Sequence, residues 1–341
     1  MFRQLLFFIS FLGICGGLQA QDPAYTQFYA SPVFINPAFT GTTLAPRISL
    51  IYRNQWASLQ NAYSTYSAAY EQFVDELNSG FGVSLMVDDQ GDGLIKSTYF
   101  KALYSYQLTI TDGYYVKLGV EAGLTQAVYA WDRFTFPDQL DKLNGSVDPL
   151  GNPNLTAEIR PDNTNATYFD IGSGLLAYSK YFYAGLALKH LSRPNDGIIK
   201  INDELTDGLP LMWSAQLGTQ INFNERNNQN RRSFISPNLL FLKQADYGQI
   251  NAGVYGGMSF IFAGAWYRHA FSNPDAIMFL IGVQQGILKV GYSYDMTVSE
   301  LAVNPSGGAH ELSLVLNFEN SESFQRQRRA KQYNDCMQLF R

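Results

Sequence analysis

The chain has 341 residues and a formal net charge of −5, and only 16% of its residues are charged. It offers no basic excess for nucleic acid, and beyond the first twenty residues no run of about eighteen apolar residues indicates a transmembrane helix. Aromatic residues reach 15%, with 22 Tyr and 24 Phe, and there are 29 Gly. An aromatic-rich, charge-poor chain of this kind is typical of an outer-membrane β-barrel, which crosses the bilayer with alternating strands.

The first twenty residues are predicted to be a signal peptide. Arg3 supplies a positive start, residues 5–15 are apolar, and Ala20 offers a small residue for cleavage. The apolar stretch is too short to span a bilayer. We therefore expect residues 1–20 to be removed after Ala20, so that the exported chain begins at Gln21. Cys336 is then the only cysteine, and no internal disulfide can form.

Residues 21–46 are predicted to form an N-terminal plug-like segment. The stretch QDPAYTQFYASPVFINPAFTG, residues 21–41, has neither a helical nor a strand period. Its prolines favour extended conformations, and its aromatic side chains need burial. Because the segment precedes the first strand, we expect it at the periplasmic mouth of a barrel, with Phe28, Tyr29 and Phe39 packed inward. These three are also candidate partner-binding residues, through the docking face that the plug would shape.

The clearest strand is residues 114–129, YYVKLGVEAGLTQAVY. Its even positions are apolar and its odd positions are polar or small, as a strand with two different faces requires. We expect Val120 to face lipid, so that Val120→Arg blocks insertion, and Lys117 to face the lumen, so that Lys117→Ala is tolerated. The same alternation recurs in three more segments: residues 97–109, 181–190 and 309–319.

Two features favour a membrane barrel over a soluble β-sandwich, whose strands would also alternate. Tyr, Trp and Phe cluster near strand ends, as interfacial girdles do. Charged residues inside strands keep to the polar face, because a charge facing lipid costs roughly 2–4 kcal/mol at mid-bilayer. The sequence therefore predicts an all-β fold, a transmembrane antiparallel β-barrel of about fourteen strands over residues 47–319. The predicted strands are residues 47–57, 63–73, 79–87, 97–109, 114–129, 167–178, 181–190, 211–224, 232–243, 249–258, 260–270, 276–285, 287–297 and 309–319.

Connector lengths predict how the barrel sits in the membrane. The longest connectors, residues 130–166 and 191–210, follow the fifth and seventh strands, and long loops of such barrels face the cell exterior. Both loops are candidates for binding a surface partner. An even strand count leaves the C-terminus in the periplasm, where residues 320–341 would form a tail. Within the tail, the basic run RQRRAKQ either stays solvated or docks an acidic periplasmic partner; its basic residues are Arg326, Arg328, Arg329 and Lys331.

No set of residues points to catalysis, to a metal site or to a cofactor. His190, His269 and His310 lie at or near strand ends, without the spacing of metal ligands. The run DDQGDG, residues 88–93, resembles part of a calcium loop, but Tyr99 stands where that loop needs Glu. A turn is the favoured interpretation, and no phosphate-binding loop or nucleophile elbow stands out. We expect a protein that is not an enzyme.

The two ends of the chain resemble one known family. The N-terminal stretch, with Asn36 and Pro37, resembles the mature N-terminus of PorP/SprF proteins, outer-membrane components of the type IX secretion system of Bacteroidetes. Residues 289–318 resemble the closing hairpin of that family. The family often has a Cys followed by Pro near its C-terminus, whereas Cys336 is followed by Met337. The matching residues of the hairpin are Gly291, Tyr292, Ser293, Tyr294, Asp295, Gly308, His310 and Glu311.

The resemblance implies a non-enzymatic barrel of the protein secretion machinery. Such proteins dock to the periplasmic ring and motor parts of the machine, or pair with one large secreted adhesin of the gliding motility or attachment kind. In the second role they help export the adhesin and hold it at the surface. Two other functions fit the residues: a passive porin or small-solute transporter, and a structural or adhesive barrel. A porin would usually carry rings of charge at a constriction, whereas many Tyr, Gly and Ala residues on the polar face favour a closed lumen.

Overall fold

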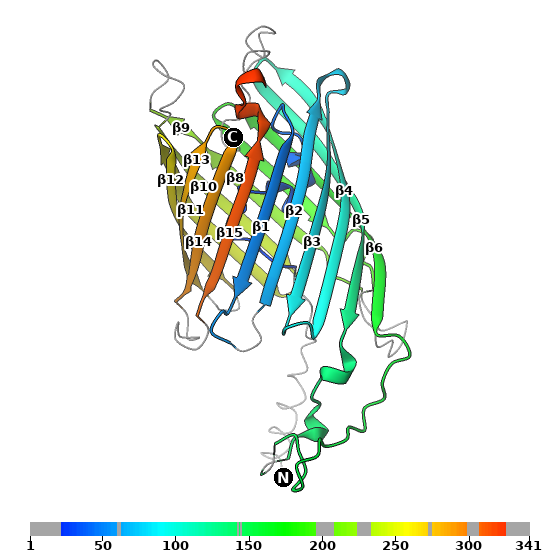
Figure 1. Cartoon of the computed structure of the whole chain (residues 1–341). Helices are drawn as coiled ribbons and strands as arrows, with labels where there is room; N and C mark the ends of the chain where they lie inside the picture. Colours follow the sequence, from blue (N-terminus) through cyan, green and yellow to red (C-terminus); the bar gives the residue numbers. More distant parts are fainter. Residues whose placement is uncertain are drawn as a thin grey trace, which may run out of the picture.

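The computed structural model describes residues 22–59, 63–141, 143, 145–195, 208–223, 233–271, 275–298 and 307–324. Over these residues the chain forms one antiparallel sheet that closes into a barrel (Figure 1). Neighbouring strands of the chain pair with each other, and β15 pairs with β1, which closes the seam. The strands are β1 Arg47–Gln55, β2 Tyr63–Val74, β3 Ser79–Gln90, β4 Ile95–Thr111, β5 Tyr114–Tyr129, β6 Asn165–Ser179, β7 Phe182–Lys189, β8 Met212–Thr219, β9 Ile221–Asn222, β10 Ser233–Gln244, β11 Tyr247–Met258, β12 Ile261–Ala270, β13 Ala276–Gln285, β14 Leu288–Thr297 and β15 Ala309–Asn317.

The strands β8 and β9 form one position of the barrel wall. Both pair with β10, and only Gln220 separates them. Taking them together, the described residues form a closed barrel of fourteen strands. The predicted fold and strand count are therefore confirmed.

The strands alternate between an outer apolar face and an inner face, which is polar on strands such as β5 and largely apolar on β12 and β13. On β5, Leu118, Val120 and Leu124 are exposed on the outside of the barrel, whereas Lys117 and Glu121 are buried inside it. The predicted facing of this strand is confirmed. The reason is the pleat, which sends successive side chains to opposite faces, so that lipid and lumen each select one set.

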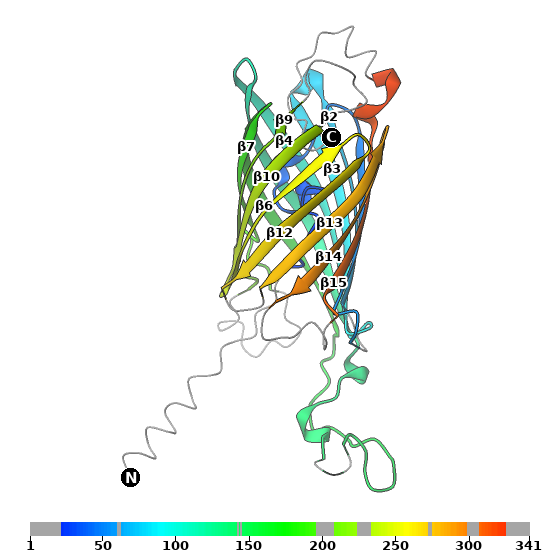
Figure 2. The same cartoon turned by 90° about the vertical axis from the view of Figure 1, so that its left-hand side faces the viewer.

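The two ends of the barrel differ. One end, here called the long-loop mouth, carries the connections 130–164 and 190–211. The other, the short-turn mouth, carries the tight turns after β2, β4 and β6, and both ends of the barrel lie there, because the amide of Phe318 donates to the Pro46 carbonyl at 3.1 Å. Figures 1 and 2 show the loop 130–164 extending well beyond its mouth.

The described helices are short 3-10 turns. Among the described residues, no helix has the length and apolar character needed to cross a membrane. The turns are η1 Pro32–Phe34, η2 Pro37–Phe39, η3 Asp75–Leu77, η4 Trp131–Arg133, η5 Pro137–Gln139 and η6 Phe318–Asn320. The first two belong to residues 22–46, which lie inside the barrel (Figure 2). The core of the molecule is therefore the contact between this segment and the inner wall.

Candidate functional site: the plugged lumen

Residues 22–46, here called the plug, cross the lumen from one mouth to the other. At the long-loop mouth the amide of Asp22 donates to Oε1 of Gln244, the last residue of β10, at 2.9 Å. At the short-turn mouth Arg47, the first residue of β1, donates to the Ala30 carbonyl at 2.6 Å. The plug therefore begins at the long-loop mouth.

The plug then turns back before it leaves the barrel. Lys189, the last residue of β7, lies toward the long-loop mouth and donates to the Phe34 carbonyl at 2.5 Å. Glu71, near the short-turn mouth, accepts the amide of Gly41 at 2.8 Å. The sequence predicted a plug at the periplasmic mouth, with its aromatic side chains buried in the lumen or at the periplasmic rim. The structure instead places it along the whole lumen, because the wall offers hydrogen-bond partners at both ends.

Asn36 fixes the middle of the plug. Its side-chain oxygen accepts the Ala38 amide at 2.9 Å and caps η2, while Pro37 supplies the φ angle of the first helical position. Its side-chain nitrogen lies 3.1 Å from the Leu175 carbonyl and 3.2 Å from the Leu186 carbonyl, on β6 and β7. The side-chain amide of Asn36 thus caps η2 and ties the plug to the wall.

The wall carries glycine where the plug backbone approaches most closely. A Cβ at Gly174 on β6 would overlap Oδ1 of Asn36, and a Cβ at Gly119 on β5 would overlap the backbone of Ala38. Neither position can take a side chain without displacing the plug. Part of the high glycine content of the chain therefore follows from the plug.

A buried ionic network joins the plug to the closing seam of the barrel. Arg53 on β1 lies 3.1 Å from Asp295 on β14 and 3.2 Å from Glu311 on β15. The carboxylate of Glu311 also accepts the backbone amides of Thr26 and Gln27, at 2.9 and 2.8 Å. Since a buried carboxylate needs partners for its lone pairs, the plug completes a site that the three seam strands leave open.

The side chain of Gln27 continues this network. Its nitrogen donates to the Glu311 carbonyl at 3.0 Å and to Ser293 at 3.3 Å, and its oxygen accepts from Ser313 at 2.6 Å. The partners of this glutamine lie on β14 and β15. The N-terminal stretch and the closing hairpin, which resembled one family at opposite ends of the sequence, are therefore in direct contact.

A second ionic network lies toward the long-loop mouth. Lys101 on β4 lies 2.7 Å from Glu121 and 3.4 Å from Asp170. His190, just beyond the end of β7, lies 2.9 Å from Asp170 and 3.0 Å from Asp22. With Lys189, which lies 3.5 Å from Glu121, three cationic and three acidic groups balance. Here too one member, Asp22, belongs to the plug.

The contacts of His190 favour its charged form. Burial lowers the pKa of His190, but the carboxylates of Asp22 and Asp170 outweigh burial and raise it to about 9. The pKa of Asp22 lies well below its usual range, because the charge and hydrogen bond of His190 outweigh the effect of burial. The pair therefore ties the start of the plug to the wall at neutral pH.

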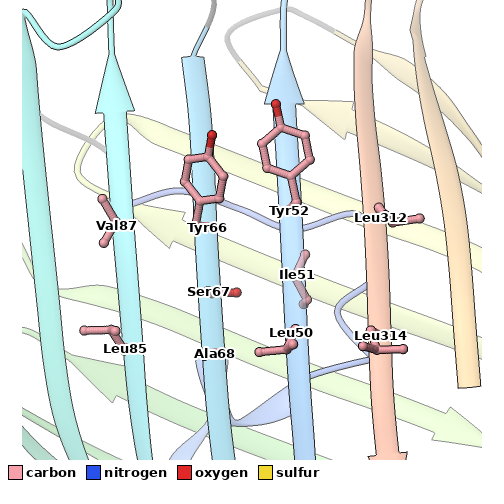
Figure 3. A pocket seen from close by; sticks show the side chains of 10 residues that line it. All are labelled: Leu50, Ile51, Tyr52, Tyr66, Ser67, Ala68, Leu85, Val87, Leu312 and Leu314. Carbon is pink, nitrogen blue, oxygen red and sulfur yellow. The ribbon is translucent and has the colours of Figure 1, made fainter. Parts of the chain in front are cut away.

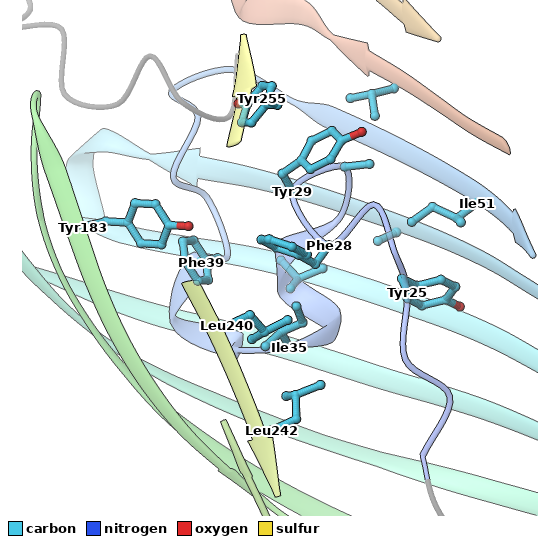
Figure 4. Close-up of a cluster of buried hydrophobic side chains, with 14 of the residues drawn as sticks. Tyr25, Phe28, Tyr29, Ile35, Phe39, Ile51, Tyr183, Leu240, Leu242 and Tyr255 are labelled. Atoms are coloured by element: carbon cyan, nitrogen blue, oxygen red, sulfur yellow. The ribbon is translucent and has the colours of Figure 1, made fainter. Parts of the chain in front are cut away.

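Aromatic side chains fill the remaining space between plug and wall. Phe28, Tyr29 and Phe39 are only 5%, 3% and 1% exposed. Tyr29 stacks on Tyr255 and Trp266, with ring centroids 5.0 and 5.9 Å apart. Figure 4 shows Phe28 and Tyr29 next to each other on one turn of the plug and Phe39 farther along it, beside Tyr183 of the wall. Any effect of these residues on a partner would therefore act through the shape of the plug.

A shallow apolar groove of about 440 Å³ lies on the outer face of the barrel, across β15, β1, β2 and β3 (Figure 3). Tyr52 and Tyr66 lie at one end of it, with ring centroids 4.9 Å apart, and Ala68 lines the groove between larger neighbours. This surface belongs to the lipid-facing side of the strands. Among the described residues, no group of three or more His, Cys, Asp and Glu side chains could hold a metal ion.

The comparison with protein families identifies the family of this chain. A model of the type IX secretion system membrane protein PorP/SprF matches residues 17–316. The chain belongs to the PorP/SprF family. This PorP/SprF protein is therefore an outer-membrane component of the type IX secretion machinery. Among curated proteins, none matches it.

Several solved structures are similar to this PorP/SprF barrel at low identity. Omp33 of Acinetobacter baumannii shares 10% identity, with 81% of this chain and 99% of that chain covered and a TM-score of 0.39. The P. putida toluene transporter TodX shares 10% identity, with 85% and 94% covered and a TM-score of 0.45. BamA from Haemophilus ducreyi lacking POTRA domains 1–3 shares 8%, with 80% and 70% covered and a TM-score of 0.38.

The motif residues of the PorP/SprF hairpin divide between the two faces of the sheet. Four of them face inward and are the ones near the plug or its ionic network: Gly291, Ser293, Asp295 and Glu311. Three face outward, where Nδ1 of His310 lies 2.8 Å from the Tyr292 hydroxyl and its ring lies near Tyr294. Gly308 precedes β15 with a φ of 66°. The tail residues Arg326, Arg328 and Arg329 lie outside the described residues.

Sequence reasoning missed most of the charged residues that hold the plug. No sequence pattern distinguishes Arg47, Arg53, Glu71 or Lys101, and His190, which was expected at or near a strand end, is buried. These residues share one feature: each lies at an inward-facing position, where a buried charge needs a partner. That feature does not identify the partner, which is the plug.

Proposed function

We propose that this PorP/SprF protein is a closed barrel that pairs with an exported surface protein of the adhesin or gliding type. It supports export of that protein and holds it at the cell surface, beside the type IX translocon. The observation that carries the proposal is the plug, which fills the lumen with a segment bound to the wall at both ends. A barrel of this kind binds other proteins at its mouths and does not conduct solutes.

The alternative of a passive porin or small-solute transporter requires the plug to leave. Withdrawal would take the amides of Thr26 and Gln27 from Glu311 at the seam and the carboxylate of Asp22 from His190 near the long-loop mouth. Breaking a buried ion pair such as His190 with Asp22 typically costs about 3–5 kcal/mol. This loss, together with the lost hydrogen bonds and aromatic packing, favours the closed state. A purely structural or adhesive barrel would also be closed, and only dependence of an exported protein on the barrel separates the two.

The two mouths then have separate tasks. With the long loops outside, as barrels of this class place them, the long-loop mouth meets the surface partner. The short-turn mouth, with the basic tail 320–341, meets the periplasmic part of the machine. Because the plug reaches both mouths, its conformation contributes to the docking surface at each of them.

The test compares the intact barrel with one that lacks residues 22–38. Barrel abundance in the outer membrane, display of surface proteins on intact cells and conductance in planar bilayers are measured for both. We expect the intact barrel to show no conductance and to support display of the exported protein on the cell surface. The deletion should insert, conduct and lose display of at least one exported protein. Steady conductance of the intact barrel, or normal display with the deletion, would overturn the proposal.

A further inference from the structure

The loop 130–164 is folded by its own contacts beyond the barrel. Residues 137–159, here called the arm tip, contain two isolated β-bridges, Asp141 with Gly145 and Val147 with Pro153. The side chains of Gln139 and Asn154 each donate to the other's backbone carbonyl, both at 2.7 Å. Because its backbone is already ordered, binding to a partner would require little further loss of conformational entropy.

Carboxylates hold the two turns of the arm tip. Asp138 accepts the Ala157 amide at 2.6 Å, and Asp148 accepts the amides of Leu150 and Asn152 at 2.8 and 2.9 Å. These backbone bonds lower the pKa of both carboxyl groups. Both are therefore charged at neutral pH, and the turns they hold are kept in one shape.

The arm tip exposes large apolar side chains in spite of this order. Leu150, Leu155 and Ile159 are 87%, 93% and 88% exposed, and Leu140 and Leu143 are exposed with them. By contrast, the aromatic residues at the base of the loop pack on one another, as Trp131 and Phe136 do at 5.0 Å between ring centroids. Five large apolar side chains exposed within residues 137–159 are more than isolated surface residues, and a concentration of this kind indicates an interaction site.

The surroundings of these side chains define the chemistry of the occupant. Residues 130–164 contain six acidic and three basic residues. Two of the basic ones form exposed ion pairs within this chain, because Arg160 lies 2.9 Å from Asp132, itself one of the six acidic residues, and Arg133 lies 3.5 Å from Asp92. The arm tip is thus apolar with a negative surround. Figures 1 and 2 show it projecting well beyond the ends of the strands, and this position argues against burial in the bilayer that the strands cross.

We propose that the arm tip docks into a folded protein whose apolar groove takes Leu150, Leu155 and Ile159 and whose rim carries Lys or Arg. This rests on the proposed function, and the occupant is the exported surface protein that depends on the barrel. The apolar side chains supply affinity by leaving water, and the carboxylates steer the complementary rim. The plug and the wall take no part in this contact.

The experiment first defines the partner and then tests the arm. Surface proteins of cells with and without the full barrel are compared, and the protein lost from the surface is the partner. Its amount per barrel is then measured after purification from solubilised outer membrane. We expect Leu150→Ser/Leu155→Ser to lower this ratio at least about tenfold, as loss of two buried leucines implies. Raising the ionic strength should lower the ratio for the intact arm as well.

The matched control is Leu59→Ser/Leu191→Ser, which removes two exposed leucines from other loops of the same mouth. It should keep the partner, and both variants should show the heat-modifiable migration of a folded barrel. Equal retention by the arm variant and the intact barrel would overturn the arm proposal and leave the proposed function standing. If no surface protein depends on the barrel, both proposals fall.

A second measurement distinguishes docking to lipid from docking to a protein. A polarity-sensitive dye is attached to Leu155→Cys in the purified full barrel, which is placed in nanodiscs without other protein. We expect the emission of a dye in water. A strong blue shift in nanodiscs would mean that the arm tip lies on lipid and would overturn docking to a protein.

Discussion

The side chain of Glu311 shows how one residue serves two elements. Its carboxylate pairs with Arg53 of β1 and accepts two amides of the plug. A strand residue in a soluble sheet would meet only its neighbours. Here the lumen brings a third segment to it, so a single substitution acts on the seam and on the plug together.

We expect Glu311→Gln to destabilise the folded barrel by about 3–5 kcal/mol, since it leaves Arg53 with one carboxylate fewer in a buried site. Urea unfolding in detergent, followed by the shift between folded and unfolded bands, measures this. Glu158→Gln on the exposed arm is the matched control and should unfold at the wild-type midpoint. A midpoint for Glu311→Gln equal to that of the control would contradict a stabilising role.

The two faces of β5 give a second residue-scale prediction. Val120→Arg places a charge on lipid near the middle of the strand and should cost about 2–4 kcal/mol, seen as loss of barrel from the outer membrane. Val120→Ala is the control and should insert. Insertion of the arginine variant at the level of the alanine variant would reverse the facing assignment.

Lys117 departs from what the alternation alone suggested. The sequence predicted a tolerant lumen position. In the structure its ammonium group donates to the carbonyls of Thr40 and Gly41, at 2.6 and 2.9 Å. Lys117→Ala should therefore leave buried acceptors unsatisfied, at about 1–3 kcal/mol each. The same urea unfolding measurement checks this, and a midpoint unchanged from wild type would restore the tolerant interpretation.

At the scale of elements, the strands follow from local sequence and the plug does not. A strand needs only a period of two and a turn, so β5 and β15 were placed within a few residues of their observed bounds. The plug has no period, and its path depends on partners as distant as Glu311, 284 residues from Gln27. Its aromatics predicted burial correctly, but no local pattern tells which wall residues receive Asp22 or Asn36.

The start of the plug should loosen at alkaline pH. The pKa of His190 is raised from 6.5 to about 9. Its contribution is therefore complete below about pH 6.5 and is lost as pH rises through about 9. Ala24→Cys, with Cys336→Ser, should be labelled faster by a thiol reagent across that window. Its rate is divided by that of Leu155→Cys on the exposed arm, which corrects for thiol ionisation.

His190→Gln is the matched variant for this titration, since it stays neutral at every pH. Its corrected labelling rate at position 24 should be high and should not change with pH. A step in this variant equal to the wild-type step would assign the pH dependence to another group.

For the whole molecule, the orientation of the barrel follows from the difference between its mouths. An epitope inserted at Gly151 in the arm should be labelled on intact cells. The same epitope at Gly113, in the tight turn after β4, should be labelled only after permeabilisation. The reverse pattern would invert the barrel and move the arm into the periplasm. Such a result would also exclude a surface partner for the arm tip.

The contacts between the plug and the seam constrain the order of assembly. β15 is the last strand to be made, and its Glu311 takes up the amides of Thr26 and Gln27 as it pairs with β1. A sheet that closed around an empty lumen would bury this carboxylate with Arg53 and no amide donors, and the plug would have to thread into a sealed wall afterwards. Closure with the plug already seated is the lower-energy route. The final strand thus forms its contacts with the first residues of the chain as the barrel closes. We expect a barrel that lacks residues 22–38 to close and insert, but more slowly than the intact chain.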